Sequence, residues 1–170
     1  MQAIISATNI NQKINYMKKL LLLSALLVFA FGFGQNSDTF NFDDIRKLSS
    51  AKLFKKFCFE NEFVNVESSD YNLLYAKGYN NDKEVANIWA YYYNNTNTFS
   101  MQFSRKYNGS ANQSFQNILN QVKKLCKFYD FYNYIGTEYI CYSCTNSSYK
   151  GKIGFFRDKE GTDTIRTFDF

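Results

Sequence analysis

The 170-residue chain contains no histidine and no proline, and it has only 8 glycines. The lack of histidine excludes Ser–His–Asp and Cys–His catalysis, histidine-ligated zinc and histidine-based pH switching. A glycine-rich phosphate-binding loop is missing as well. The scarcity of proline and glycine beside 14 Tyr and 18 Phe is typical of AT-rich bacterial coding. The abundance of aromatic residues therefore indicates no function by itself.

An excess of charge of one sign is also missing once the N-terminus is set aside. The whole chain has a formal net charge of +5, but residues 1–34 contain three lysines and no acidic residue, so the remainder carries +2. Nucleic-acid binding depends on clustered Lys and Arg against phosphate. We therefore expect no nucleic-acid partner, and nothing in the sequence indicates a cofactor.

Residues 17–34 have the order of a secretory signal peptide. Met17-Lys18-Lys19 is a short basic region, Leu20–Phe33 is an apolar run, and Gly32 and Gly34 precede a cleavage site at Gln35. The run is shorter than the about 20 residues that span a bilayer, which favours cleavage over a retained anchor.

This signal predicts a protein that is exported to the periplasm or the cell exterior, with no membrane attachment after cleavage. Residues 1–16 fit no signal architecture, so we interpret them as an over-extended start, with Met17 as the initiator. The mature chain then begins with a polar tether over residues 35–41, followed by a single α+β domain over residues 42–170.

Hydrophobic spacing predicts three helices in the domain, over residues 43–48, from a Ser49 or Ser50 cap to Glu60, and over 112–129. In the last helix, Leu119, Val122 and Leu125 lie along one stripe and are expected to face the core. Strand-like runs occupy residues 71–79, 85–93, 98–105, 137–144, 152–157 and 163–168.

The order of these elements suggests an internal repeat. A helix followed by three strands occurs twice, and the two halves align at an offset of 68 residues, which places Cys58 on Cys126. We predict tandem α-β-β-β units over residues 42–106 and 110–170. Short links favour an antiparallel sheet, with the helices packed on one face.

The four cysteines, Cys58, Cys126, Cys141 and Cys144, are candidates for a structural disulfide or for buried thiols. Cys141 and Cys144 have redox-motif spacing, but residues three apart on a strand point to opposite faces, so they are not expected to bond each other. A disulfide would instead join a helix cysteine to a strand cysteine. The wide spacing of Cys58 and Cys126 argues against a four-cysteine zinc site, and no metal is expected.

Strand register places a candidate binding surface on the second and third strands. If Asn94–Asn97 is a hairpin loop, Ile88, Ala90 and Tyr92 pair with Phe103, Met101 and Phe99 on the apolar face. A five-residue loop over residues 80–84 would add two further tyrosines to the opposite, ring-rich face. The candidate binding residues are then Tyr71, Tyr75, Trp89, Tyr91, Tyr93 and Gln102.

These features favour an exported, non-catalytic binding or interaction module with a protein or glycan partner. Trp and Tyr dominate interface hot spots, and their flat rings suit sugars or aromatic ligands. Two alternatives stay open: a hydrolase acting on glycans with carboxylates alone, and a structural envelope or adaptor protein. A further alternative is that Phe40–Phe42 or the second half of the chain covers the aromatic surface.

Overall fold

The structure is a computed structural model that describes residues 39–106, 109–149 and 151–170. The predicted over-extended start at 1–16, the predicted signal peptide at 17–34 and most of the predicted tether at 35–41 lie outside these residues. Among the helices in the described ranges, none has the length and apolar character needed to cross a membrane.

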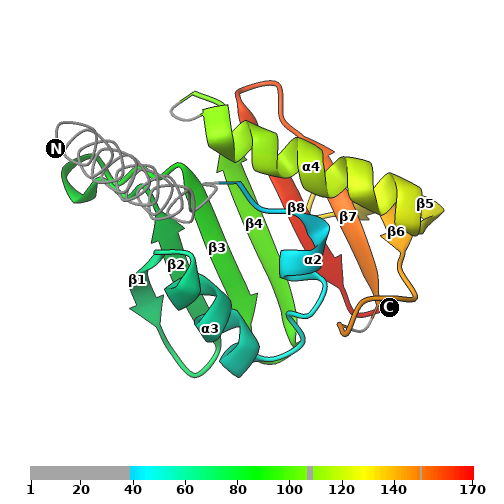
Figure 1. The fold of residues 1–170 in the computed structure, drawn as a ribbon, viewed down its shortest axis with the longest axis horizontal. Helices are drawn as coiled ribbons and strands as arrows, with labels where there is room; N and C mark the ends of the chain where they lie inside the picture. The colour runs from blue at the N-terminus through cyan, green and yellow to red at the C-terminus, as the bar shows by residue number, and fades with distance from the viewer. Residues whose placement is uncertain (1–38, 107–108, 150) are drawn as a thin grey trace, which may run out of the picture. The chain divides into compact units, whose positions relative to one another are not determined.

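The described residues form a mixed α+β structure around one antiparallel sheet, as predicted (Figure 1). The described ranges contain helices α2 (Phe42–Ile45), α3 (Ala51–Glu60) and α4 (Gly109–Leu125) and the 3-10 helix η1 (Asn81–Lys83). The strands are β1 (Val64–Ser68), β2 (Asn72–Lys77), β3 (Ile88–Tyr93), β4 (Thr98–Ser104), β5 (Lys127–Tyr134), β6 (Thr137–Ser143), β7 (Lys152–Arg157) and β8 (Thr162–Phe168). Their spatial order is β1-β2-β3-β4-β8-β7-β6-β5.

Each half of this domain contributes a helix followed by four strands, not the three strands predicted. The additional strands, β1 and β5, are the two edges of the sheet. Edge strands have one neighbour only, and the five residues of β1 are all exposed, so β1 lacks the alternation by which a strand is detected in a sequence. The internal repeat itself stays a prediction.

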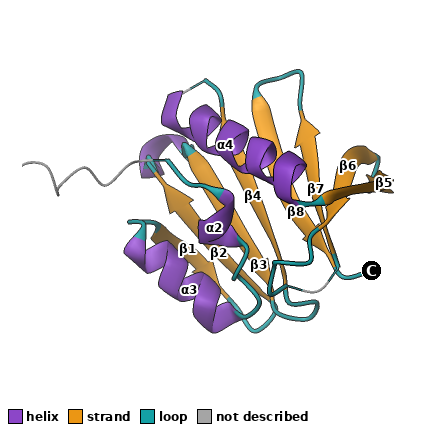
Figure 2. Cartoon of the chain, turned by 45° about the vertical axis from the view of Figure 1, so that its right-hand side comes forward, coloured by secondary structure: helices purple, strands orange, loops and turns teal. Residues whose placement is uncertain are grey.

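The helices contact the sheet through aromatic side chains. The ring centres of Phe54 in α3 and Tyr92 are 5.2 Å apart. The ring centre of Phe115 in α4 lies 6.0 Å from that of Phe103 and 5.9 Å from that of Phe155. Figure 2 shows α2, α3 and α4 in front of the strands, with the β5–β6 end strongly twisted against β3 and β4. These contacts define the main core.

The structure confirms the predicted serine cap of α3. It corrects the predicted end of α4 and its predicted core-facing stripe. Ser50 caps α3, where its Oγ accepts a hydrogen bond from the Leu53 N–H at 3.4 Å. Helix α4 ends at Leu125, so the predicted continuation to Tyr129 is wrong, because β5 begins at Lys127. Leu125 is 55 % exposed, whereas Val122 is fully buried.

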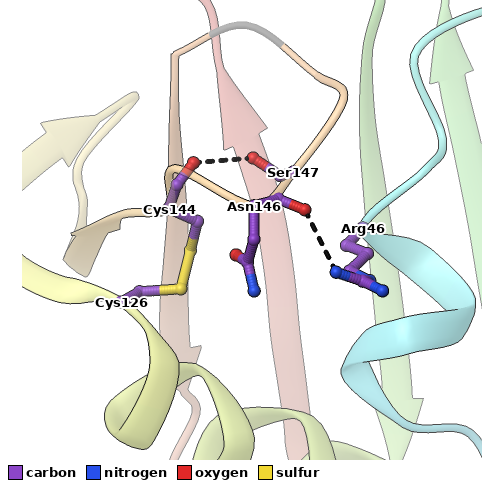
Figure 3. Close-up of a disulfide and its surroundings, with 5 residues drawn as sticks. All are labelled: Arg46, Cys126, Cys144, Asn146 and Ser147. Atoms are coloured by element: carbon purple, nitrogen blue, oxygen red, sulfur yellow. Dashed lines mark hydrogen bonds between the residues drawn. A yellow bond between two sulfur atoms is a disulfide. The ribbon is translucent and has the colours of Figure 1, made fainter.

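A disulfide joins Cys126, directly after α4, to Cys144, directly after β6 (Figure 3). The loop that follows Cys144 lies against α2, where Arg46 Nη1 donates to the Asn146 carbonyl at 3.4 Å. The Ser148 N–H in turn donates to the Arg46 carbonyl at 2.8 Å. The cross-link therefore fixes the end of α4 and the start of a loop that holds α2 in place.

Removing this cross-link is expected to lower the free energy of unfolding by about 3 kcal/mol, because it closes a loop of 18 residues and restricts the unfolded chain. Chemical unfolding of the Cys126→Ala/Cys144→Ala variant, with and without a reductant, measures the effect. The reductant should destabilise the unsubstituted protein and leave the variant unchanged. An equal response of both proteins would show that another disulfide supplies the stability.

Candidate binding face of the sheet

The strands have a second face, opposite the residues that contact α3 and α4, which we call the open face. Along β3, Ile88, Ala90 and Tyr92 are buried, and the residues between them are half-buried. Pairing across the sheet assigns the following residues to the open face: Trp89, Tyr91, Tyr93, Ser100, Gln102, Ser104, Thr162, Thr164, Arg166, Gly154, Phe156 and Cys141.

The predicted β3–β4 register is confirmed. Tyr92 pairs with Phe99, Ala90 with Met101 and Ile88 with Phe103. The rings of Trp89, Tyr91 and Tyr93 therefore share the open face with Gln102.

The predicted β2 register is wrong by one residue. Tyr75 pairs with Ala90, not with Trp89, because Asn80 and Val85 already pair and the loop contains four residues. Tyr75 consequently faces the core, where its ring packs edge-on against Phe54 at 6.0 Å. Tyr71 precedes β2, is 66 % exposed, and is not part of the open face.

A pocket of about 190 Å³ lies at one end of the open face, beside Trp89. Gln102, Ser104 and Thr162 line it with polar side chains, and the loop residues Glu84–Ala86 close one side. The Tyr79 ring packs against the Trp89 ring in a T-shaped arrangement, with 5.5 Å between the ring centres. The pocket therefore has an aromatic wall beside hydrogen-bonding groups.

The second half of the chain extends the aromatic surface of the open face. Tyr139 and Phe168 form a small buried cluster with Cys141, against which Tyr132, Tyr134 and Phe156 pack. Gly154 makes room for it, because a Cβ there would lie 2.7 Å from the Phe168 ring and 3.0 Å from the Cys141 Sγ. The cluster lies beside the rings that the first half contributes, Trp89, Tyr91 and Tyr93. Arg166 bridges the cluster and these rings.

Arg166 links Tyr93 of β3 with Tyr134 of β5. Its Nη1 donates to the Tyr93 hydroxyl at 3.2 Å and its Nη2 to the Tyr134 hydroxyl at 3.0 Å. The guanidinium carbon also lies 4.6 Å and 4.1 Å from the centres of these two rings. No spacing in the sequence indicated Arg166 or Tyr134, since the three residues lie far apart in the chain.

Two hydroxyls on this face, those of Tyr91 and Tyr139, stay protonated at neutral pH. Burial, followed by the electrostatic interaction with Tyr93, raises the pKa of Tyr91. Burial also raises the pKa of Tyr139, although the Arg166 guanidinium acts in the opposite direction. These side chains are therefore available as neutral hydrogen-bonding groups and not as bases.

The free thiols Cys58 and Cys141 are buried and poorly suited to nucleophilic chemistry. Burial, reinforced by the charge of Asp130, raises the pKa of Cys141 to about 11. Burial raises the pKa of Cys58 still further. Both side chains are therefore thiols, not thiolates, at physiological pH.

A second pocket, of about 300 Å³, separates α2 from α3 and contains three carboxylates. Each has a local partner: Asp44 accepts from the Asn41 N–H at 2.7 Å, Asp43 pairs with Arg46 at 2.8 Å, and Glu60 pairs with Lys56 at 3.6 Å. These contacts account for the acidic residues as a helix cap and surface ion pairs.

Across the described ranges, no three His, Cys, Asp or Glu side chains come together as possible metal ligands. Comparison of the chain with protein-family models, curated proteins and solved structures finds no match. The function is therefore argued from the geometry of the open face.

Proposed function

We propose that the protein is an exported, non-catalytic module that binds glycans on the open face, the side of the sheet away from the helices. The observation that carries this proposal is the pocket beside Trp89, where an edge-packed indole ring stands among an amide and two hydroxyl side chains. A flat apolar ring surrounded by hydrogen-bonding groups matches a sugar, which has an apolar face and hydroxyls around its rim.

The carboxylate-only hydrolase is less well supported by the same pocket. Glycoside hydrolysis generally needs two carboxyl groups about 5–9 Å apart across the scissile bond. Glu84 is the one acidic residue among those that line the Trp89 pocket. The acidic pocket between α2 and α3 has no aromatic platform comparable to Trp89, and its carboxylates are engaged locally.

An adaptor function has one observation in its favour. Beside the disulfide, at the β5 end of the sheet, Leu125, Phe128, Phe131 and Ile140 are 55 %, 56 %, 56 % and 41 % exposed. Exposed apolar clusters of this kind often mark protein interfaces. Exposed apolar side chains fit a protein surface better than a glycan.

Glycan binding can be followed through Trp89, because it is the single tryptophan of the chain. We expect its fluorescence to change saturably when the protein is titrated with dextran, xylan or polygalacturonate. Tyr91→Ala should weaken the binding seen this way, and calorimetry should show that Trp89→Ala/Tyr91→Ala loses about 30-fold or more in affinity, as hot-spot aromatics do.

Tyr71→Ala is the matched control, because this ring is exposed but lies off the open face. It should bind as the unsubstituted protein does. Full binding by the Trp89→Ala/Tyr91→Ala variant, or no response to any of the three polymers, would contradict the proposal. A loss of several kcal/mol in stability from the double substitution would show that the two rings act as core.

A further inference from the structure

Arg166 is a half-buried cation in the middle of the open face, on the central strand β8. Its guanidinium donates hydrogen bonds to the hydroxyls of Tyr93 and Tyr134. Both rings lie against the guanidinium, and Phe168 lies 5.9 Å away. Tyrosine side chains, and not carboxylates, therefore hold the guanidinium in place.

Within the part of the chain that the structure describes, no carboxylate forms an ion pair with Arg166. Its Nε is buried and has no hydrogen-bond partner. The arginines on the opposite face of the sheet differ from Arg166 in this respect. Arg105 and Arg157 both form an ion pair with Asp163. A partly desolvated cation without an anion is unfavourable, and ring contacts offset only part of that cost.

Arg166 is half-buried, and its neighbours across the sheet, Ser100 and Gly154, are both small. The Phe168 ring and the Cys141 Sγ already fill the space over Gly154, so an anion would reach the guanidinium from its remaining exposed side. Lys152, also on β7 and two residues before Gly154, adds a second cation, which lies 4.5 Å from the Tyr129 ring. The nearest acidic residue in this row is Asp130 on β5, beyond Gly154 and Cys141, and its Oδ1 accepts from the Phe131 N–H.

We propose that Arg166 binds the carboxylate of an acidic sugar, so that the preferred ligand is a polyuronate. The inference rests on the proposed glycan-binding function and names its ligand class. Each terminal nitrogen of a guanidinium carries two N–H groups, and each uses one on a tyrosine here, so a donor remains on both for a carboxylate. Tyr91 and Tyr93, on the same face, supply ring surfaces for the sugar.

Calorimetric titration with polygalacturonate and with neutral dextran tests this assignment. Polygalacturonate should bind more tightly than dextran, and its affinity should fall as NaCl is added. Arg166→Gln should lose about 10-fold to 100-fold in affinity for polygalacturonate, as expected for a charged hydrogen-bond pair, with little effect on dextran. Arg166→Lys, which keeps the charge but not the planar fork, should lose less.

Lys124→Gln is the matched control, because it removes the same charge from an exposed position on α4. An equal loss with Lys124→Gln and Arg166→Gln would overturn the assignment in favour of diffuse charge. A second contrary result is that polygalacturonate and dextran bind with equal affinity, with both affinities dependent on Trp89. That result would overturn the preference for an acidic sugar and leave the proposed glycan binding intact. Polyglutamate binding that needs Arg166, without polygalacturonate binding, would overturn both in favour of a peptide ligand.

Thermal unfolding separates a local effect of Arg166 from a loss of folding. Arg166→Lys must unfold at a temperature close to that of the unsubstituted protein for its binding to be compared. If Arg166→Gln unfolds early, the comparison of Arg166→Lys with Lys124→Gln decides the question. Unchanged polygalacturonate affinity in a folded Arg166→Lys protein, with dextran binding just as tightly, would contradict the proposal.

Discussion

Phe115→Ala is expected to lower the free energy of unfolding by about 3–5 kcal/mol, because it leaves a cavity between α4 and the sheet. Phe115 is 1 % exposed. Its ring contacts Phe103 of β4 at 6.0 Å and Phe155 of β7 at 5.9 Å, so it joins strands from both halves of the chain. Arg157 also lies 5.4 Å from the ring. Urea unfolding followed by Trp89 fluorescence and by far-UV circular dichroism measures the change.

Leu125→Ala in the same helix is the control. Its side chain is 55 % exposed, so its removal should change stability by less than about 1 kcal/mol. Both substitutions remove apolar atoms from α4, and helix propensity favours alanine in each case. Equal losses for the two variants would show that helix α4 presents a different face to the core.

The misplaced end of α4 shows where periodicity stops being informative. Phe115, Ile118 and Val122 have helical spacing and are buried, as the pattern predicts. Leu125, Cys126 and Tyr129 continue the same spacing, but the helix ends at Leu125. Cys126 is instead fixed by its bond to Cys144, a contact that no local pattern contains.

The two hairpins of the first half illustrate how register depends on the loop. The β3–β4 register was predictable, because alternation in Phe99, Met101 and Phe103 and the turn chemistry of Asn94–Asn97 agree. The β2–β3 register was not, because Asn80 and Asn81 are both good turn residues. The structure uses Asn80 to cap the short η1 turn and places Glu84 in the left-handed region at φ 51°. That shift by one residue moves Tyr75 into the core.

The candidate site was accordingly predictable in part. Trp89, Tyr91, Tyr93 and Gln102 follow from local alternation, since β3 and β4 are joined by a short loop. The Arg166 contacts were not predictable, because they depend on β4 pairing with β8 and on β5 reaching the same face. Pairing between distant strands is set by the whole sheet and leaves no mark on local sequence.

The second large expected effect concerns Asp163, a fully buried carboxylate on the helix side of β8. Arg157 binds it with two hydrogen bonds, Nε to Oδ1 at 3.1 Å and Nη2 to Oδ2 at 3.0 Å. Arg105 Nε lies 3.5 Å from Oδ1. The three residues join the ends of β4, β7 and β8, and the carboxylate is the single anion shared by two cations.

Asp163→Ala is therefore expected to lower the free energy of unfolding by about 3–5 kcal/mol, because it leaves two arginines without their anion and opens a cavity. Asp163→Asn keeps the size of the side chain and should recover a part of this loss. Urea unfolding at neutral pH and moderate salt measures both. Asp43→Asn is the matched control, since its pair with Arg46 at 2.8 Å is exposed and should contribute less than about 1 kcal/mol.

A further substitution tests whether the Asp163 effect comes from the ion pairs themselves. In a background of Arg105→Gln and Arg157→Gln, the Asp163→Asn substitution should become much less destabilising, because no unpaired cation is created. A double-mutant comparison isolates this coupling from the cavity effect. If Asp163→Asn is as destabilising in that background as alone, the buried carboxylate acts through packing and backbone hydrogen bonds, and the arginines contribute little.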